Sequence, residues 1–256
     1  MKIISKIYFL ILLLSFLSLQ IFGENNYKQK KMLVVVQGGS QLTNLAMGDG
    51  RQLAQLLGHF NTITDVIGAD DYKTASINNY DYIFYLGFYP RNLVPITFLN
   101  DIVKTNKPLT WINTGFIEFS DKINTSDLYG FNVTKLDTAS IFDFVKSDNK
   151  SFTKGEGNIN LIEISDYSRV EIIATAISSK KKKEVPYIIK SKNLVYIADS
   201  PFAYANSTDR YLFFADYLHE ILNEPHEESH TAIVRIEDVT PLDDPDKIRD
   251  ITDYLS

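Results

Sequence analysis

The run Met32-Leu-Val-Val-Val-Gln37 ends at the pair Gly38-Gly39 and is the first strong structural signal after the N-terminus. A continuous β-branched run without polar alternation is typical of a strand buried on both faces, and such strands belong to parallel sheets. Thr43 or Asn44 can then cap a helix that Gly58 is placed to end. Its leucines share one side: Leu45, Leu53, Leu56 and Leu57. We therefore expect a βα unit at this point.

Strands and helices continue to alternate after that unit. Strands are expected over residues 62–67, 81–86 and 108–112, with a helix over 94–104 between the last two. This spacing indicates right-handed βαβ units with helices on both faces of the sheet. The expected fold is α/β, with a flavodoxin-like or Rossmann-like, mostly parallel sheet.

The pattern changes in the second half of the chain. It weakens from residue 121 to 154, and strand-like segments then follow one another at 170–177, 185–189 and 194–197, which fits an antiparallel β extension. Thr208 is expected to cap a helix over residues 209–222. Together, residues 31–224 are predicted to form one α/β domain.

A further βα unit is expected over residues 231–256. It consists of a strand at 231–236 and a helix at 245–255 that begins at Asp244. A strand without later partners cannot build a domain, so we expect an incomplete βα unit, the truncated start of a second domain.

The N-terminus has the pattern of an export signal. Lys2 and Lys6 accompany an apolar stretch that reaches Phe22, and the sequence turns polar after Gly23. Ile21 stands where signal cleavage prefers a small residue, so an uncleaved membrane anchor is the alternative. Residues 1–23 are therefore predicted to be a signal peptide or anchor, and the protein to be periplasmic or extracellular.

Composition excludes several classes of function. The hydrophobic share of 45% is ample for a core, and the net charge of −6 gives no basic footprint for nucleic acid. The one basic run, four lysines at residues 180–183, predicts a solvated hairpin tip rather than an anionic-ligand patch. The chain has no cysteine, which excludes the thiolate chemistry of class I glutamine amidotransferases, enzymes that share the expected architecture.

Two loop motifs are weak candidates for chemistry. Gly38, Gly39 and Ser40 lie between a strand and a helix, where α/β folds bind small ligands, although a tight turn needs glycines in any case. Residues 226–230 spell H-E-x-x-H, but Pro225 precedes them and a strand is expected to follow. No helix can then place both histidines on one face, and a polar linker is expected.

A serine hydrolase is also not favoured. Ser200, His219 and Asp199 are its nominal residues, but no serine has a nucleophile-elbow sequence and His219 falls inside an expected helix. Asp199 and Ser200 are instead expected to end a strand at the ligand-facing edge of the sheet.

Adjacent carboxylates, Glu237 and Asp238, follow the strand expected at 231–236. Residues at the C-terminal end of a strand are where barrel enzymes place their chemistry. The stretch Ile233-Val-Arg-Ile-Glu-Asp-Val-Thr-Pro-Leu-Asp-Asp-Pro-Asp-Lys-Ile-Arg resembles the opening of an uncharacterised family of exported proteins related to polysaccharide deacetylases. Residues 80–87 and 196–219 resemble the N-terminal α/β domain of that family.

The resemblance implies a metal-dependent carbohydrate deacetylase in which Glu237 is the general base and Asp238 a ligand of a divalent metal, zinc. Because no H-x-x-x-H pair follows, the metal site is incomplete and the chain itself is expected to be catalytically silent. The alternative is that both carboxylates merely end a strand.

Two functions are thus expected. The first is an accessory N-terminal domain of an exported hydrolase that acts on cell-envelope or extracellular carbohydrate. The second is a non-catalytic envelope domain that holds a small ligand at residues 38–43. Carbohydrate is the expected partner, a membrane only through an uncleaved signal, and the oligomeric state stays open.

Overall fold

The computed structural model describes residues 29–37, 43–89, 94–139, 141–155, 157–202, 207–225 and 244–255. The chain divides into two compact units, Met1–Glu224 and Pro225–Ser256. The described part of the smaller unit includes α7 (Pro245–Leu255), which has the bounds predicted for it. None of the described helices combines the length and the apolar character that a membrane span requires.

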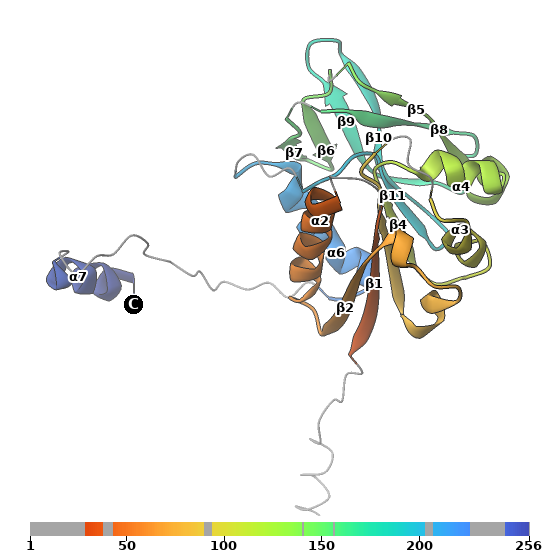
Figure 1. The fold of residues 1–256 in the computed structure, drawn as a ribbon. Helices are drawn as coiled ribbons and strands as arrows, with labels where there is room; N and C mark the ends of the chain where they lie inside the picture. The colour runs from red at the N-terminus through yellow and green to blue at the C-terminus, as the bar shows by residue number, and fades with distance from the viewer. Residues whose placement is uncertain are drawn as a thin grey trace, which may run out of the picture. The chain divides into compact units, whose positions relative to one another are not determined.

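A mixed sheet of nine strands organises the larger unit, in the order β2-β1-β3-β4-β11-β10-β9-β6-β7 (Figure 1). Its first half is parallel and comprises β1 (Lys30–Val36), β2 (Thr62–Gly68), β3 (Tyr82–Leu86), β4 (Leu109–Ile112) and β11 (Leu194–Ile197). The second half is antiparallel and comprises β10 (Lys183–Ser191), β9 (Glu171–Ser178), β6 (Phe144–Ser147) and β7 (Lys150–Thr153). The predicted fold class, a parallel sheet with an antiparallel extension, is confirmed.

One strand was assigned to the wrong half. Strand β11 was predicted within the antiparallel extension, but it pairs in parallel with β4 and antiparallel with β10. It is buried along its whole length, as a strand with neighbours on both sides requires. The strand β11 is therefore the point where the two halves of the sheet join.

Helices cover both faces of the sheet, as predicted. On one face lie α2 (Thr43–Leu57) and α6 (Arg210–Leu222), and on the other lie α3 (Ile96–Ile102) and α4 (Phe116–Lys122) (Figure 1).

Two details of the helices differ from the prediction. The helix α6 begins one residue later than predicted, because its cap is Asp209 and not Thr208. The Asp209 carboxylate accepts from the Tyr211 N–H at 3.0 Å. Leu45 was expected on the buried side of α2, but it is 60% exposed.

The segment in which the sequence pattern weakens is structured. It contains the short helix α5 (Thr125–Tyr129) and the strand β5 (Phe131–Asp137), which pairs with β8 (Ile159–Ile164) in a separate two-stranded sheet. Two 3₁₀ turns, η1 (Ala69–Asp71) and η2 (Ser76–Asn79), lie between β2 and β3.

An aromatic cluster fills the α3–α4 face. Trp111 on β4 stacks against Phe119 and packs against the tilted ring of Tyr85, with ring centroids 5.5 Å and 4.2 Å away. Its indole N–H donates to the Thr114 carbonyl at 2.9 Å. Buried rings of this size contribute a large share of the hydrophobic stabilisation and hold the turn after β4 in place.

Candidate functional site at the carboxyl edge of the sheet

The parallel strands end together at one edge of the sheet. In open α/β sheets ligands bind in the crevice outside these carboxyl ends, at the point where the strand order reverses. Here the order reverses between β1 and β3. The residues that follow the strands at this edge are Gln37 after β1, Gly87 after β3, Asn113 after β4 and Asp199 near the end of β11.

Gln37 fixes the loop that follows β3. Its side-chain oxygen accepts from the N–H groups of Phe88 and Tyr89 at 2.5 and 2.6 Å, and its amide nitrogen donates to the Tyr89 carbonyl at 2.9 Å. The Thr114 hydroxyl donates to the same carbonyl at 3.0 Å. Because Gln37 is only 2% exposed, these bonds are shielded from water and hold the loop firmly.

Asn113 forms the sharp turn between β4 and α4. Its φ of 68° lies in the left-handed region, which an asparagine tolerates better than most residues. The side-chain amide donates to the Gly87 carbonyl at 3.0 Å and accepts from Asn160 at 3.1 Å. A turn of this kind can present a nucleophile above a sheet. The residue here is a neutral amide, which is not a nucleophile.

A carboxyl–hydroxyl pair lies just after β11, the strand whose Ile197 carbonyl accepts from the Asn113 N–H at 2.8 Å. The Ser200 hydroxyl donates to Asp49 Oδ2 at 3.1 Å, which links the end of β11 to α2. The helix α2 lies unusually close to the sheet, because a Cβ atom on Gly50 would stand 2.5 Å from the Val36 side chain. Burial raises the pKa of Asp49, while the hydrogen bond from Ser200 acts against that shift. A perturbed carboxyl at this edge is a candidate for proton transfer.

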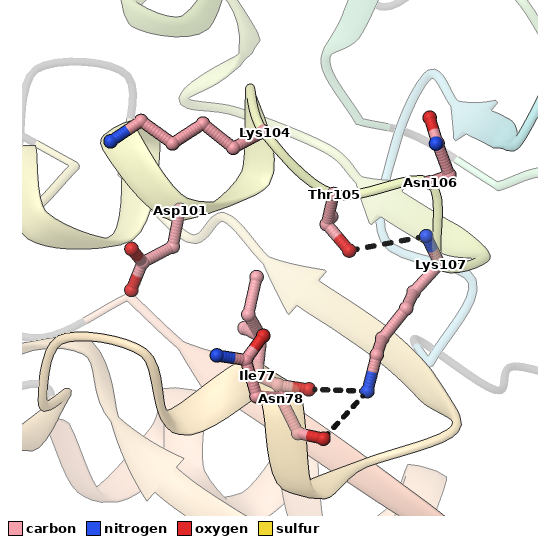
Figure 2. A pocket seen from close by; sticks show the side chains of 7 residues that line it. All are labelled: Ile77, Asn78, Asp101, Lys104, Thr105, Asn106 and Lys107. Atoms are coloured by element: carbon pink, nitrogen blue, oxygen red, sulfur yellow. Dashed lines mark hydrogen bonds between the residues drawn. The ribbon is translucent and has the colours of Figure 1, made fainter.

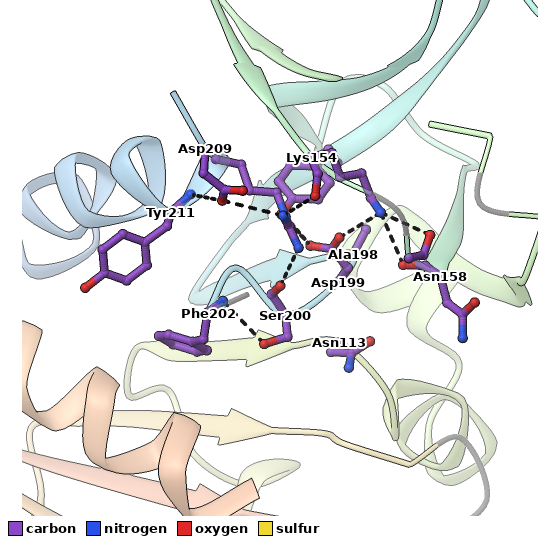
Figure 3. Close-up of polar contacts among 12 residues, drawn as sticks. Asn113, Lys154, Asn158, Ala198, Asp199, Ser200, Phe202, Asp209 and Tyr211 are labelled. Atoms are coloured by element: carbon purple, nitrogen blue, oxygen red, sulfur yellow. Dashed lines mark hydrogen bonds and ion pairs between the residues drawn. The ribbon is translucent and has the colours of Figure 1, made fainter. Parts of the chain in front are cut away.

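A buried charge cluster lies next to Ser200 (Figure 3). The Asp199 carboxylate forms ion pairs with Lys154 Nζ and Arg210 Nε, both at 3.1 Å, and accepts from the Tyr187 hydroxyl at 2.5 Å. Burial raises the pKa of Tyr187 well above its ordinary value, so the phenol stays protonated and donates. The cluster joins β11 to β10, to α6 and to the segment that follows β7.

The cluster also positions Ser200. Arg210 Nη2 donates to the Ser200 carbonyl at 2.8 Å, and Arg210 Nη1 donates to the carbonyl of Lys154. On its other side the guanidinium pairs with Asp209, the cap of α6, at 3.5 Å. Since two cations face two carboxylates, the cluster is close to neutral, and its role is to hold the end of β11 rather than to attract a charged ligand.

A hollow of about 510 Å³ lies away from this edge, near the amino ends of β3 and β4 (Figure 2). Two of its charged groups, Lys107 and Asp101, hold neighbouring segments in place. Lys107 Nζ donates to the carbonyls of Ile77 and Asn78 at 3.0 and 2.8 Å, and Asp101 accepts from the Tyr72 hydroxyl at 2.7 Å. These contacts stabilise η2, and we assign the hollow no function.

Several residues predicted from the sequence lie outside the described residues. They are the N-terminal segment 1–23, the loop residues Gly38, Gly39 and Ser40, the H-E-x-x-H motif at 226–230, the strand expected at 231–236, and the pair Glu237 and Asp238. The roles predicted for them stay predictions. Across the described ranges, no cluster of three His, Asp or Glu side chains is arranged to hold a metal ion.

The nominal serine hydrolase residues do not form a triad. Asp199 is engaged by two cations, and Ser200 donates to Asp49, whereas the ring of His219 packs against Phe60 with centroids 4.9 Å apart. As expected, Asp199 and Ser200 lie just after β11, separated from its end by Ala198. The sequence alone did not reveal that Asp49, 151 positions from Ser200, completes the pair.

Comparisons with known proteins identify the fold. No family model and no curated protein matches the chain. Among solved structures, a ThuA-like protein from Bacteroides uniformis is 14% identical with a TM-score of 0.54, covering 77% of this chain and 94% of that protein. A ThuA-like protein from Parabacteroides merdae is 11% identical, with a TM-score of 0.49 and coverages of 79% and 93%. The glutaminase domain of CTPS from Trypanosoma brucei, in complex with acivicin, is 9% identical, with a TM-score of 0.43 and coverages of 78% and 96%.

These findings correct the family resemblance drawn from the sequence. The similar structure with a TM-score above 0.5 is a ThuA-like protein, not a relative of polysaccharide deacetylases. The quoted segments 80–87 and 196–219 fall on β3 and on β11 to α6, where a buried aromatic strand or a capped helix follows from the fold and is not specific to a family. The deacetylase assignment is therefore wrong, and so is the function predicted with it, an accessory domain of an exported carbohydrate hydrolase.

Proposed function

We propose that the larger unit is a ThuA-like domain that binds a small, neutral polar molecule at the carboxyl edge of its sheet and exchanges a proton with it through Asp49. The observation that carries the proposal is the hydrogen bond between Asp49 and Ser200, just after β11. A general acid or base must lie within hydrogen-bonding reach of its substrate, and this edge is the usual ligand site of the architecture.

The electrostatics of the edge favour a neutral ligand. Asp199 is balanced by Lys154 and Arg210, whereas Asp49 forms no ion pair within the described residues. Gln37 and Asn113 add only neutral amides, and their hydrogen bonds hold the surrounding loops in fixed positions. A hydroxyl- or carbonyl-bearing compound suits such a lining better than an anion, which Asp49 would repel.

Glutamine hydrolysis through a thiolate is not part of the proposal, since the chain contains no cysteine. Asn113 occupies the sharp turn after β4, and its amide cannot form an acyl intermediate. The chemistry open to the site is proton transfer, with Ser200 as the hydrogen-bond partner that orients the Asp49 carboxyl.

The test is a screen of neutral sugars, polyols and amides by NMR against the wild-type chain. We expect a ligand to shift the backbone signals of Gly87, Asn113 and Ser200, and Asp49→Asn to weaken its binding. Asp121→Asn, at an exposed carboxyl on α4, is the matched control and should bind like the wild type. A ligand that shifts signals elsewhere, or binds Asp49→Asn unchanged, would rule the proposal out.

A further inference from the structure

A separate cavity of about 370 Å³ lies in the antiparallel half of the larger unit. One wall is the segment before β6, with Ala139, Ile141 and Phe142, and the other is the turn between β9 and β10, with Lys180 and Lys181. None of these residues belongs to the carboxyl-edge site, so the cavity is independent of the proposed function.

Hydrogen bonds tie the two walls together. The Asp143 carboxylate accepts from the Ser179 N–H at 2.9 Å and from the Ser179 hydroxyl, at the start of the turn. The Asp143 N–H donates to the Ile177 carbonyl at 3.0 Å, and the Asp143 carbonyl accepts from the Lys154 N–H at 2.8 Å. The turn that carries the lysines is therefore held in a fixed position against the opposite wall, which lowers the entropic cost of binding.

The cavity lining combines exposed cations with apolar side chains. Lys180 and Lys181 are exposed, and neither forms an ion pair with a carboxylate of the described residues. The carboxylate among the described lining residues, Asp143, has a lowered pKa, chiefly because Ser179 donates hydrogen bonds to it and to a smaller extent because Lys180 lies near it. Phe142 is 1% exposed and Ile141 packs partly buried against the core. Two exposed lysines thus share a cavity lining with Ile141 and Phe142.

The lysine run lies at a hairpin turn, as the sequence predicts. In contrast to the expectation from the sequence that the run binds no anion, we propose that this cavity binds a small amphipathic anion, a carboxylate or sulfonate on a planar apolar body of one or two rings. The volume lies at the lower end of the range of roughly 300–1,000 Å³ that is typical of ligand sites. The chain as a whole has a net charge of −6 and repels anions, so the affinity must come from Lys180 and Lys181 locally.

The experiment uses 2-naphthoate as the probe, followed by its own fluorescence anisotropy on titration with the full chain. We expect 2-naphthoate to bind saturably. Its neutral analogue, 2-naphthalenemethanol, should bind about ten-fold more weakly, because the charge-assisted contacts are lost. Replacing both lysines, in Lys180→Ala/Lys181→Ala, should weaken 2-naphthoate binding by about the same factor.

Two further variants separate a site from general electrostatics. Lys146→Ala/Lys150→Ala removes the same charge from exposed positions on the neighbouring β6–β7 hairpin and should leave the affinity unchanged. Ala139→Asp adds a carboxylate to an exposed wall position without disturbing the core, and it should abolish binding. Equal losses in both double-lysine variants, undiminished binding to Ala139→Asp, or no saturable binding by the wild type would each overturn the proposal.

Discussion

At the scale of the residue, Asp49 is a carboxyl whose ionisation the fold opposes. Burial raises its pKa above the ordinary value of 3.8, so the folded state holds the proton more tightly than the unfolded state does. This tighter proton binding contributes to the free energy of unfolding. The contribution is complete below about pH 3.8, and it is lost as the pH rises through the folded-state pKa. A carboxyl that lowers the stability of the fold when it ionises is typical of a functional site.

Asp49→Asn should remove that pH dependence. We expect the variant to unfold like the wild type at about pH 3.5 and to be the more stable of the two at about pH 7, where the wild-type carboxyl is charged. Urea unfolding of both chains at the two pH values measures the difference. A stability gain that is the same at both pH values would contradict the assigned cause.

Two glycines offer a matched test of packing at the edge. A Cβ atom on Gly87 would lie 2.0 Å from the Thr114 carbonyl oxygen, whereas one on Gly48, within α2, would meet nothing within 4 Å. Gly87→Ala should thus destabilise the fold by about 1–3 kcal/mol, since backbone must move. Gly48→Ala should stabilise it by about 0.5–1 kcal/mol, because alanine favours the helix. Thermal unfolding measures both, and a destabilised Gly48→Ala would show that α2 is packed differently.

At the scale of the element, the loop after β3 depends on one side chain. Gln37→Leu keeps the size of that side chain but leaves the N–H groups of Phe88 and Tyr89 without their acceptor, which should cost about 1–3 kcal/mol. Hydrogen exchange of these two amides should accelerate more than that of the β3 amides. Gln55→Leu, on the exposed side of α2, is the control and should change neither quantity. Equal acceleration throughout β3 would show global rather than local loosening.

The elements also show what the sequence could predict. Strands β1, β3 and β4 carry buried apolar runs, a signal that does not depend on distant contacts. The edge strand β2 is only partly buried, but all four strands were located within two residues of their ends. The strands β6 and β7 are only four residues long and partly exposed, so no periodicity could build up. Part of the candidate site could be predicted from the sequence, because Asp199 and Ser200 follow a recognisable strand. Their partners Asp49, Lys154 and Arg210 could not be predicted, because only the tertiary fold brings them close.

At the scale of the whole molecule, the buried cluster at Asp199 links the two halves of the sheet. Asp199→Asn leaves Lys154 buried without its partner, and we expect a loss of about 3–5 kcal/mol in the free energy of unfolding. Asp121→Asn, at an exposed position, should change it little. Denaturant unfolding of the two variants is the measurement, and similar stabilities for both would show that the cluster contributes little.

The position of β11 has a consequence for how the molecule opens. It is the fifth of nine strands, and it is hydrogen-bonded to β4 on one side and β10 on the other. Neither half of the sheet can separate as a rigid body without breaking one of these two ladders. Partial unfolding should therefore proceed inward from the outer strands, β2 and β7, and the amides of β11 should become accessible only when the cooperative unit as a whole unfolds.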